Sequence, residues 1–345
     1  MTFSWRPAPG PVVCIGETMA ALAPEPVAPL RSADLLRLDV AGAESNVARY
    51  LADHGVPVHW VSALGNDPFG QRVLDRMCAS GVGVSGVRID PARPTGLIVK
   101  DPGPEGTRVH YYRSSSAASA MDPRVLAGDP VRGAALLHLS GITPALSASC
   151  RALVEAALPS DPADRPYAVS FDVNHRPALW ADGTAAKTLR TLADRADIVF
   201  VGLDEARMLW GGELADAQAV RALIPRPAVL VVKDGARAAT AFLGSATVTV
   251  PALTVEVVEP VGAGDAFAAG FLAGLLRGSD PVRALRRGHL TAVSALRVTA
   301  DHGPLPPGDL LEALLDADDP AWAGTVGIAY PEDVGHPSSL PEPGQ

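Results

Sequence analysis

Short apolar runs alternate with helical patterns along most of the chain, and this alternation restricts the fold more than any other feature. Runs rich in β-branched residues cover residues 12–15, 56–64, 135–139, 167–172, 198–201 and 229–233. Segments with apolar residues at helical spacing lie between them, at 43–54, 68–79, 148–158, 185–196 and 205–209. Strands that alternate with helices form a parallel sheet with helices on both faces. We therefore expect an α/β fold around one central, mostly parallel sheet.

Three shorter runs, at 84–89, 96–101 and 108–113, do not follow this alternation. The last two flank a Pro- and Gly-containing turn at 102–106 and so predict a hairpin. We expect these runs to form a small separate sheet that serves as a lid. The stretch from about 316 to 345 is rich in Pro, Gly, Asp and Glu and shows little periodicity. That composition predicts a mostly irregular extension.

An extended, β-branched run over 246–258 leads into the segment 258–276. This segment, which reads VEPVGAGDAFAAGFLAGLL, carries the clearest chemical signal. A Gly-Ala-Gly turn at the start of an apolar helix would present free amides to an anion, and Asp265 follows at once. An anion cradle beside a carboxylate base suits phosphoryl transfer to a hydroxyl. Gly-rich turns before helices are common, so this turn alone could be structural. It matches neither GxGxxG nor GxxxxGK[ST].

Charge and cysteine content narrow the class of protein. The net charge is −9 and no long basic run occurs, which makes nucleic acid and anionic membrane poor partners. Cys14, Cys78 and Cys150 are scattered, match no metal spacing and fit reduced thiols in a cytoplasmic protein. The opening MTFSWRPAPGP does not resemble a secretory leader, and the apolar run within 266–276 is too short to span a bilayer.

Two motifs far apart in the sequence make the chain resemble the ribokinase-like (PfkB) carbohydrate kinases from roughly residue 12 to 307, and a third stretch between them agrees. AGAESNVARYLADHG at 41–55 is similar to the family's Gly-Gly-Ala-x-x-Asn-x-Ala signature, with Ala41 at the first Gly. LGNDPFG at 64–70 is also typical. The stretch 259–265 resembles Asp-Thr-x-Gly-Ala-Gly-Asp, with Glu259 and Pro260 at the Asp-Thr positions. The resemblance implies a ribokinase-like kinase domain over about 10–310, with lid strands drawn from about 16–40 and 84–113.

The resemblance also implies roles for single residues. Asp265 would take the proton from the acceptor hydroxyl, and the amides of Gly262, Ala263 and Gly264 would stabilise the transferring phosphoryl group. Gly42 would let the sugar approach closely, and Asn46 would offer a donor and an acceptor to sugar hydroxyls. Asn46 could instead merely cap or pack at the start of its helix.

The nucleotide would be ATP with Mg²⁺. By resemblance, Lys233, Gly235 and Arg237 would meet phosphate or adenine edges together with Gly262 and Gly264, and Thr291 falls loosely at the family's late Asn. Glu205 matches the Glu of an Asn-x-x-Glu motif that helps organise magnesium, but Gly202 stands at the Asn position. Ordinary surface charge is the alternative for Glu205, Lys233 and Arg237.

Three local stretches, at 16–24, 110–119 and 172–180, are most similar to 2-keto-3-deoxygluconate kinases. Tyr111 and Arg113 would lie on the lid hairpin and Arg176 after a strand, so that two guanidinium groups could grip a sugar-acid carboxylate. Both arginines could instead pair with local acids. Leu97 and Ile98 replace a Tyr expected near this position, which keeps fructokinase or another neutral-sugar kinase open.

Two further classes remain to be weighed against a kinase. A non-catalytic sugar-binding regulator on the same fold is one, and a Rossmann oxidoreductase, disfavoured by the missing GxGxxG, is the other. We treat His110 and His175 as pocket or packing residues. The expected partner is a small sugar or sugar acid, with a homodimer through the lid suggested only by resemblance.

Overall fold

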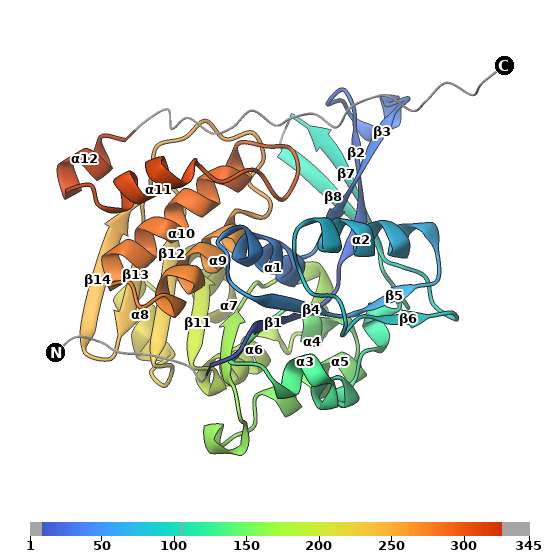
Figure 1. Ribbon diagram of the computed structural model, residues 1–345, viewed down its shortest axis with the longest axis horizontal. Coiled ribbons are helices and arrows are strands. Elements are labelled where there is room, and N and C mark those ends of the chain that lie inside the picture. Colours follow the sequence, from blue (N-terminus) through green and yellow to red (C-terminus); the bar gives the residue numbers. More distant parts are fainter. Residues whose placement is uncertain (1–8, 105, 326–345) are drawn as a thin grey trace.

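A central sheet of eight strands forms the body of the protein in the computed structural model, which describes residues 9–104 and 106–325 (Figure 1). The strands lie in the order β14-β13-β12-β11-β10-β9-β1-β4. Six are parallel and the edge pair β13 and β14 is antiparallel. Their bounds are β1 Val12–Ile15, β4 Val58–Val61, β9 Leu136–Ser140, β10 Ala168–Asp172, β11 Ile198–Gly202, β12 Val229–Asp234, β13 Ala238–Leu243 and β14 Ala246–Pro251. The expected α/β fold is confirmed.

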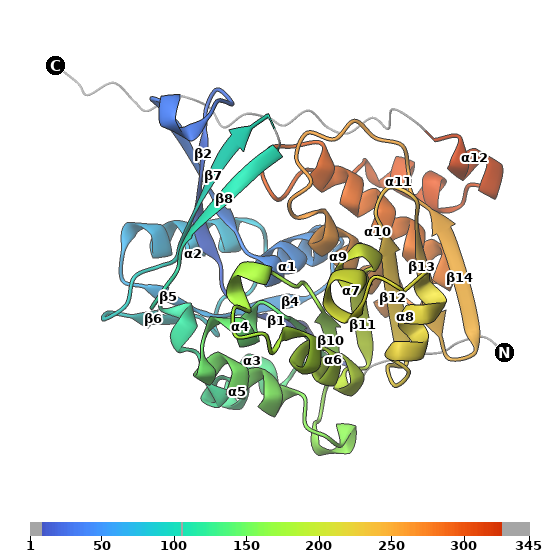
Figure 2. The ribbon, with the colours of Figure 1, turned by 180° about the vertical axis from the view of Figure 1, so that it is seen from behind.

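Helices cover both faces of this sheet, because successive side chains of a strand point to opposite faces. Val12 and Cys14 of β1 join one core cluster, while Val13 and Ile15 join the other. The first cluster packs under α1 Ala43–Asp53, α2 Pro68–Ala79, α9 Ala263–Leu276, α10 Pro281–Leu296, α11 Gly308–Leu315 and α12 Asp319–Ala323. The second packs under α3 Asp129–Arg132, α4 Thr143–Leu146, α5 Ala148–Ala157, α6 Ala185–Arg195, α7 Leu203–Trp210 and α8 Ala217–Leu223, which Figure 2 shows from behind.

A second, four-stranded sheet projects from the body as the lid sheet, at the top of both views (Figures 1 and 2). It comprises β3 Leu36–Ala41, β2 Met19–Pro24, β7 Leu97–Gly103 and β8 Gly106–Tyr112, in that order. The expected hairpin is present as β7 and β8. The prediction that the run 84–89 also joins the lid sheet is wrong. The end of this run, β6 Arg88–Asp90, pairs instead with β5 Ala63–Gly65 in a separate two-stranded sheet.

Two further differences concern the C-terminal half. The extended run expected over 246–258 is a strand only to Pro251, where β14 ends. Residues 319–323, expected within a mostly irregular extension, form α12, which buries Trp322. The rest of that extension, from residue 326, lies outside the described residues.

The parallel strands all end at the edge of the main sheet that faces the lid sheet, and ligands of open α/β sheets bind outside the carboxyl ends of strands. Asp172 ends β10, Gly202 ends β11, and Lys233 lies one residue before the end of β12. Residues far apart in sequence therefore meet there. Within 9–104 and 106–325, every helix is too short or too polar to cross a membrane.

Candidate active site

The turn before α9 leaves its backbone amides available to a ligand. Gly262 has φ +85°, a left-handed conformation that L side chains rarely adopt, and a Cβ there would lie 2.8 Å from the Asp301 carbonyl oxygen. The amide of Ala263 makes only a long 3.4 Å contact to the Pro260 carbonyl oxygen. First-turn amides have no acceptor within their own helix. The N-terminus of α9 can therefore hold an anion.

Asp265 lies in the first turn of α9 and is 8% exposed. Its carboxylate accepts from Asn46 Nδ2 at 2.9 Å and from Asn174 Nδ2 at 3.2 Å. Burial raises the pKa of Asp265 to about 7; the hydrogen bond from Asn46 opposes this and the nearby Asp172 adds to it. A carboxylate with a pKa near neutrality is suited to exchange a proton with a substrate hydroxyl.

A lysine and two carboxylates lie near Asp265, at or just beyond the ends of β10, β11 and β12. They are Lys233, Asp172 and Glu205. Lys233 Nζ lies 2.9 Å from Asp172 Oδ2, and a Cβ at Gly264 would lie 3.2 Å from Lys233 Nζ. Burial lowers the pKa of Lys233, but Asp172 and Glu205 outweigh it, so the net pKa is raised. The ammonium is therefore charged and borders the anion-binding turn.

Glu205, the candidate metal ligand, is engaged by the backbone. Its carboxylate accepts from the amides of His175 and of Gly202, the latter at 3.1 Å. The bond from Gly202 is one half of a capping box at the start of α7, since the N-cap Gly202 has no side chain to supply the other half. Burial raises the pKa of Glu205, and Asp172 adds to the rise. Within 9–104 and 106–325, no group of three His, Cys, Asp or Glu side chains is placed to enclose a metal. A carboxylate with spare lone pairs still fits Mg²⁺, which binds through one or two carboxylates and substrate phosphates.

The expected sugar side is assembled around α1. Gly42 is the N-cap of α1, and a Cβ there would lie 2.4 Å from the Glu17 carbonyl oxygen. Asn46 is buried and turns its amide to Asp265, so it does more than cap its helix. Its Oδ1 and that of Asn174 are buried without a partner. Orphaned acceptors at such a place are suited to receive hydroxyl protons from a ligand.

The two arginines expected to form a clamp have different surroundings. Arg113 is buried and its Nε and Nη2 both meet Glu17, with the Nε at 2.5 Å. Arg113 therefore pairs with a local acid, although a guanidinium has further N–H groups to offer. Arg176 is exposed and donates to the His175 carbonyl oxygen at 3.2 Å. Its charge lowers the pKa of Asp265. Tyr111 is 40% exposed on β8.

A cavity of about 620 Å³ adjoins the turn and fits a nucleotide base and its phosphates. Its polar wall includes Glu205, Lys233, Gly235 and Gly264. Its apolar wall is formed by Leu253, Val255, Val257, Phe267, Ala292, Val293 and Leu296. Three of the residues expected at the nucleotide, Lys233, Gly235 and Gly264, are therefore brought together.

Three residues expected at the nucleotide, Gly262, Thr291 and Arg237, do not line this cavity, although Gly262 directly precedes Ala263, which does. Thr291 is fully buried between helices, where its hydroxyl donates to the Arg287 carbonyl oxygen at 2.7 Å and meets His54 Nε2 at 2.8 Å. The next residue on α10, Ala292, faces the cavity instead. Arg237 is exposed and paired with Asp234. The lining of this cavity therefore does not support a nucleotide contact by Thr291 or Arg237.

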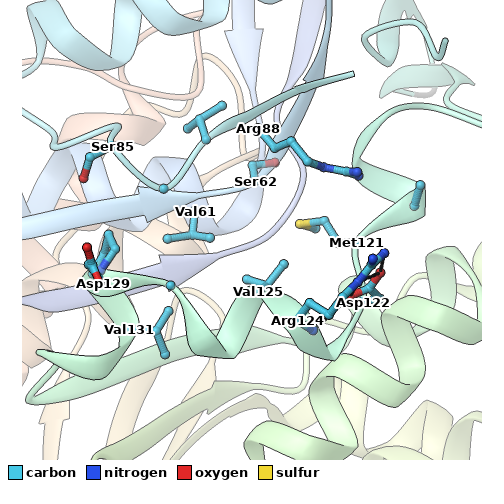
Figure 3. Close-up of a pocket in the computed structure, with 15 residues that line it drawn as sticks. Val61, Ser62, Ser85, Arg88, Met121, Asp122, Arg124, Val125, Asp129 and Val131 are labelled. Atoms are coloured by element: carbon cyan, nitrogen blue, oxygen red, sulfur yellow. Dashed lines mark hydrogen bonds and ion pairs between the residues drawn. The ribbon is translucent and has the colours of Figure 1, made fainter. Parts of the chain in front are cut away.

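A second cavity, of about 610 Å³, lies away from this centre, between the β4–β6 region and residues 120–131 (Figure 3). Its floor includes Val61 and Met121. Arg124 at its rim is already matched by Asp122, with Nε 3.0 Å from Oδ1. None of Asp265, Asn46 or Lys233 lines it, so it has no part in the chemistry considered above.

Several residues of the centre were not singled out from the sequence. They are Glu17, Lys100, Asp172, Asn174 and Asp301. Asp172 and Asn174 carried a signal, because polar residues directly after a buried parallel strand meet at the binding edge of the sheet. Asn174 has φ +39°, an uncommon conformation for a residue other than Gly. Lys100 and Asp301 are 201 residues apart in the sequence and come together only in the folded chain, so no local sequence pattern indicates their contact.

Comparison with known proteins gives a consistent match over most of the chain. The model of the pfkB family of carbohydrate kinases matches residues 11–306. A Bacillus subtilis 2-dehydro-3-deoxygluconokinase is 36% identical, over 88% of this chain and 95% of the relative. A Thermoproteus tenax 2-dehydro-3-deoxygluconokinase is 33% identical, over 89% and 94%. The crystal structure of a putative Ribokinase II from E. coli with ATP and Mg²⁺ has a similar fold, with a TM-score of 0.77, 21% identity and coverage of 85% and 94%.

Proposed function

Because this chain belongs to the pfkB family of carbohydrate kinases, we propose that it transfers the γ-phosphate of ATP to a hydroxyl of 2-keto-3-deoxygluconate or a closely related sugar acid. The 2-dehydro-3-deoxygluconokinases that align with most of its length act, by their names, on this acid. The observation that carries the proposal is the exposed guanidinium of Arg176, whose positive charge lowers the pKa of the buried Asp265 carboxyl. A sugar acid has a carboxylate for the first and a hydroxyl for the second.

In the proposed reaction the sugar lies between α1 and the N-terminus of α9. Asp265 accepts the proton of the attacking hydroxyl, whose oxygen forms the new bond to the γ-phosphorus as the bond to ADP breaks. The two asparagine amides that donate to Asp265 fix the direction of its carboxylate. Positioning of this kind is the main contribution a protein makes to phosphoryl transfer.

The charge that develops on the transferring group is met by fixed positive groups. The amides of Gly262, Ala263 and Gly264 and the ammonium of Lys233 border the same space. Mg²⁺, when bound, offsets phosphate charge, and Glu205 is the side chain of this chain that would hold it. The apolar wall of the adjoining cavity would receive the adenine ring and exclude water.

Release of ADP with a panel of acceptors tests the proposal. The panel comprises 2-keto-3-deoxygluconate, 2-keto-3-deoxygalactonate, fructose and ribose, each with ATP and Mg²⁺. We expect the highest kcat/KM with one of the two acids. Turnover of fructose without turnover of either acid would overturn the proposed substrate while leaving the kinase assignment intact.

One observation favours a neutral sugar, such as fructose, as a second candidate. Glu17 already neutralises Arg113, so only Arg176 of the expected clamp is available without rearrangement. A single exposed cation binds a carboxylate less firmly than two buried ones. The same panel separates the two candidates.

A further inference from the structure

A lysine of the lid sheet is buried against the segment that follows α10. Lys100, on β7, places Nζ 2.9 Å from Asp301 Oδ1 and 3.2 Å from the carbonyl oxygen of Thr299. The side chains of Lys100 and Asp301 are 6% and 5% exposed. Lysine is almost never fully buried without a partner, so the Lys100–Asp301 pair is a specific contact between the lid sheet and this segment.

Asp301 touches the proposed reaction centre at two points. Its Oδ2 lies 3.5 Å from Asn46 Nδ2, the same nitrogen that donates to Asp265 at 2.9 Å. Its backbone lies against Gly262, where an added Cβ would come within 3.2 Å of the Asp301 Cα. One amide group therefore lies between two buried carboxylates, and Asp301 is the one that a lysine contacts directly.

We propose that Lys100 is a positioning residue for phosphoryl transfer: by holding and neutralising Asp301, it leaves the Asn46 amide directed at Asp265 and shields Asp265 from a second negative charge. The proposal rests on the proposed function only in taking Asp265 as the base, and not on which sugar is phosphorylated. Without Lys100, two like charges would compete for one amide. Like charges close together disfavour ionisation, so the base would need a higher pH to work.

Other charged groups near Asp265 and near the Lys100–Asp301 pair come from several different elements. Those that face Asp265 are Asp172 from β10, Arg176 after β10 and Lys233 from β12. Those that share a small cavity with Lys100 are Glu25, Arg37 and Glu259. Tyr50 from α1 faces Asp301, and its pKa is raised by burial and further by the Asp301 charge. None of these groups bonds to Asp301 among the contacts described, so a change at position 100 or 301 leaves their own partners in place.

The test is the acid limb of the pH profile of kcat/KM, which reports the free enzyme's base. Lys100→Met should move the limb to higher pH by about one unit, because it leaves Asp301 charged and unopposed. Asp301→Asn should move it to lower pH, because the ammonium then acts alone. The double variant K100M/D301N should bring the limb back to its wild-type position. Each limb is read relative to its own plateau, so a general loss of activity does not affect it.

Arg37→Met is the matched control. Arg37 also joins the lid sheet to the 299–301 segment, through the Thr299 hydroxyl, but it does not touch Asp301. Its limb should stay in place. If K100M fails to fold, D301N and the double variant still decide the matter. A limb that stays at its wild-type position in both D301N and K100M, or in D301N alone if K100M does not fold, would overturn the proposal. Near-normal turnover of Asp265→Asn would instead remove the base, and with it the proposed mechanism.

Discussion

Replacing Asp265 with Asn should abolish most activity and, at the same time, stabilise the fold at neutral and alkaline pH. Asparagine has the same size but cannot accept the proton of the substrate hydroxyl. Loss of a general base typically lowers the rate by about 10²–10⁴-fold. The substitution should be tolerated, because the orphaned Oδ1 atoms of Asn46 and Asn174 allow either amide to flip and accept from the new side chain.

The gain in stability follows from the pKa of the buried carboxyl. Burial raises the pKa of Asp265 from an ordinary value near 3.8 to about 7. A group with a raised pKa in the folded chain supports folding fully below pH 4, and this support is lost as the pH rises through 7. At pH 8 the wild-type chain therefore carries a buried charge that disfavours folding by roughly 4 kcal/mol, at 1.36 kcal/mol for each pH unit. The amide of the Asp265→Asn variant would carry no such charge.

Urea unfolding of both proteins at pH 4 and pH 8 measures the difference, with ADP release measured in parallel. The free energies of unfolding should agree closely at pH 4. The variant should be more stable at pH 8 by about 2–4 kcal/mol. Every other titrating group is common to both proteins and cancels. A stability difference that is the same at both pH values would refute the reasoning about burial, and turnover within a few fold of wild type would remove Asp265 as the base.

Three further outcomes are expected. Arg176→Lys, which loses the planar fork but keeps the charge, should weaken the apparent affinity for the sugar acid by about 1–3 kcal/mol, read from KM, while activity on fructose barely changes. Wild-type kcat/KM should fall with decreasing pH below about 7, because protonated Asp265 cannot accept the hydroxyl proton, and a pH–rate profile checks this. Thr291→Val should lower stability in urea by about 1–3 kcal/mol, because His54 and the Arg287 carbonyl lose their partner, with KM for ATP unchanged.

Controls separate these effects from general damage. Arg124→Lys changes an exposed arginine on the remote cavity and should leave the ratio of acid to neutral-sugar activity unaltered. Equal losses by Arg176→Lys on acid and neutral sugars would make Arg176 structural. A raised KM for ATP in Thr291→Val would restore Thr291 to the nucleotide site. An activity that stays flat down to pH 5 would contradict a base with a pKa near 7.

The main sheet could be predicted from the sequence because its parallel strands are buried on both faces and are therefore almost wholly apolar. β9, β10, β11 and β12 were recognised within a residue or two for this reason. The strands of the lid sheet and those of the two-stranded sheet β5–β6 were harder to tell apart from the sequence. Short half-exposed strands have the same alternation whichever sheet they join, and the pairing of β6 with β5 depends on how the chain returns in space.

Residues of the candidate site could be predicted where they belong to one local sequence motif. They could not be predicted where the site depends on contacts between distant segments. The turn at 262–264 and Asp265 are contiguous, so one sequence motif names them together. The state of Arg113 depends on Glu17, a partner 96 residues away, so no motif could tell whether its charge is free. Thr291 illustrates a different limit. Neighbouring residues on a helix point about 100° apart. An alignment error of one position therefore replaces Ala292, which lines the cavity, with Thr291, which is buried between helices.

Competition between two acceptors in one tube is the most direct test of the central claim. Equal concentrations of 2-keto-3-deoxygluconate and fructose are mixed with ATP, Mg²⁺ and the wild-type protein, and the phosphorylated products are quantified by mass spectrometry at low conversion. Their ratio is the ratio of the two kcat/KM values. We expect the phosphorylated sugar acid to dominate by at least about tenfold, the ratio that 1.4 kcal/mol of carboxylate recognition supplies. Equal amounts of the two products, or an excess of phosphorylated fructose, would contradict the proposed recognition of a sugar acid.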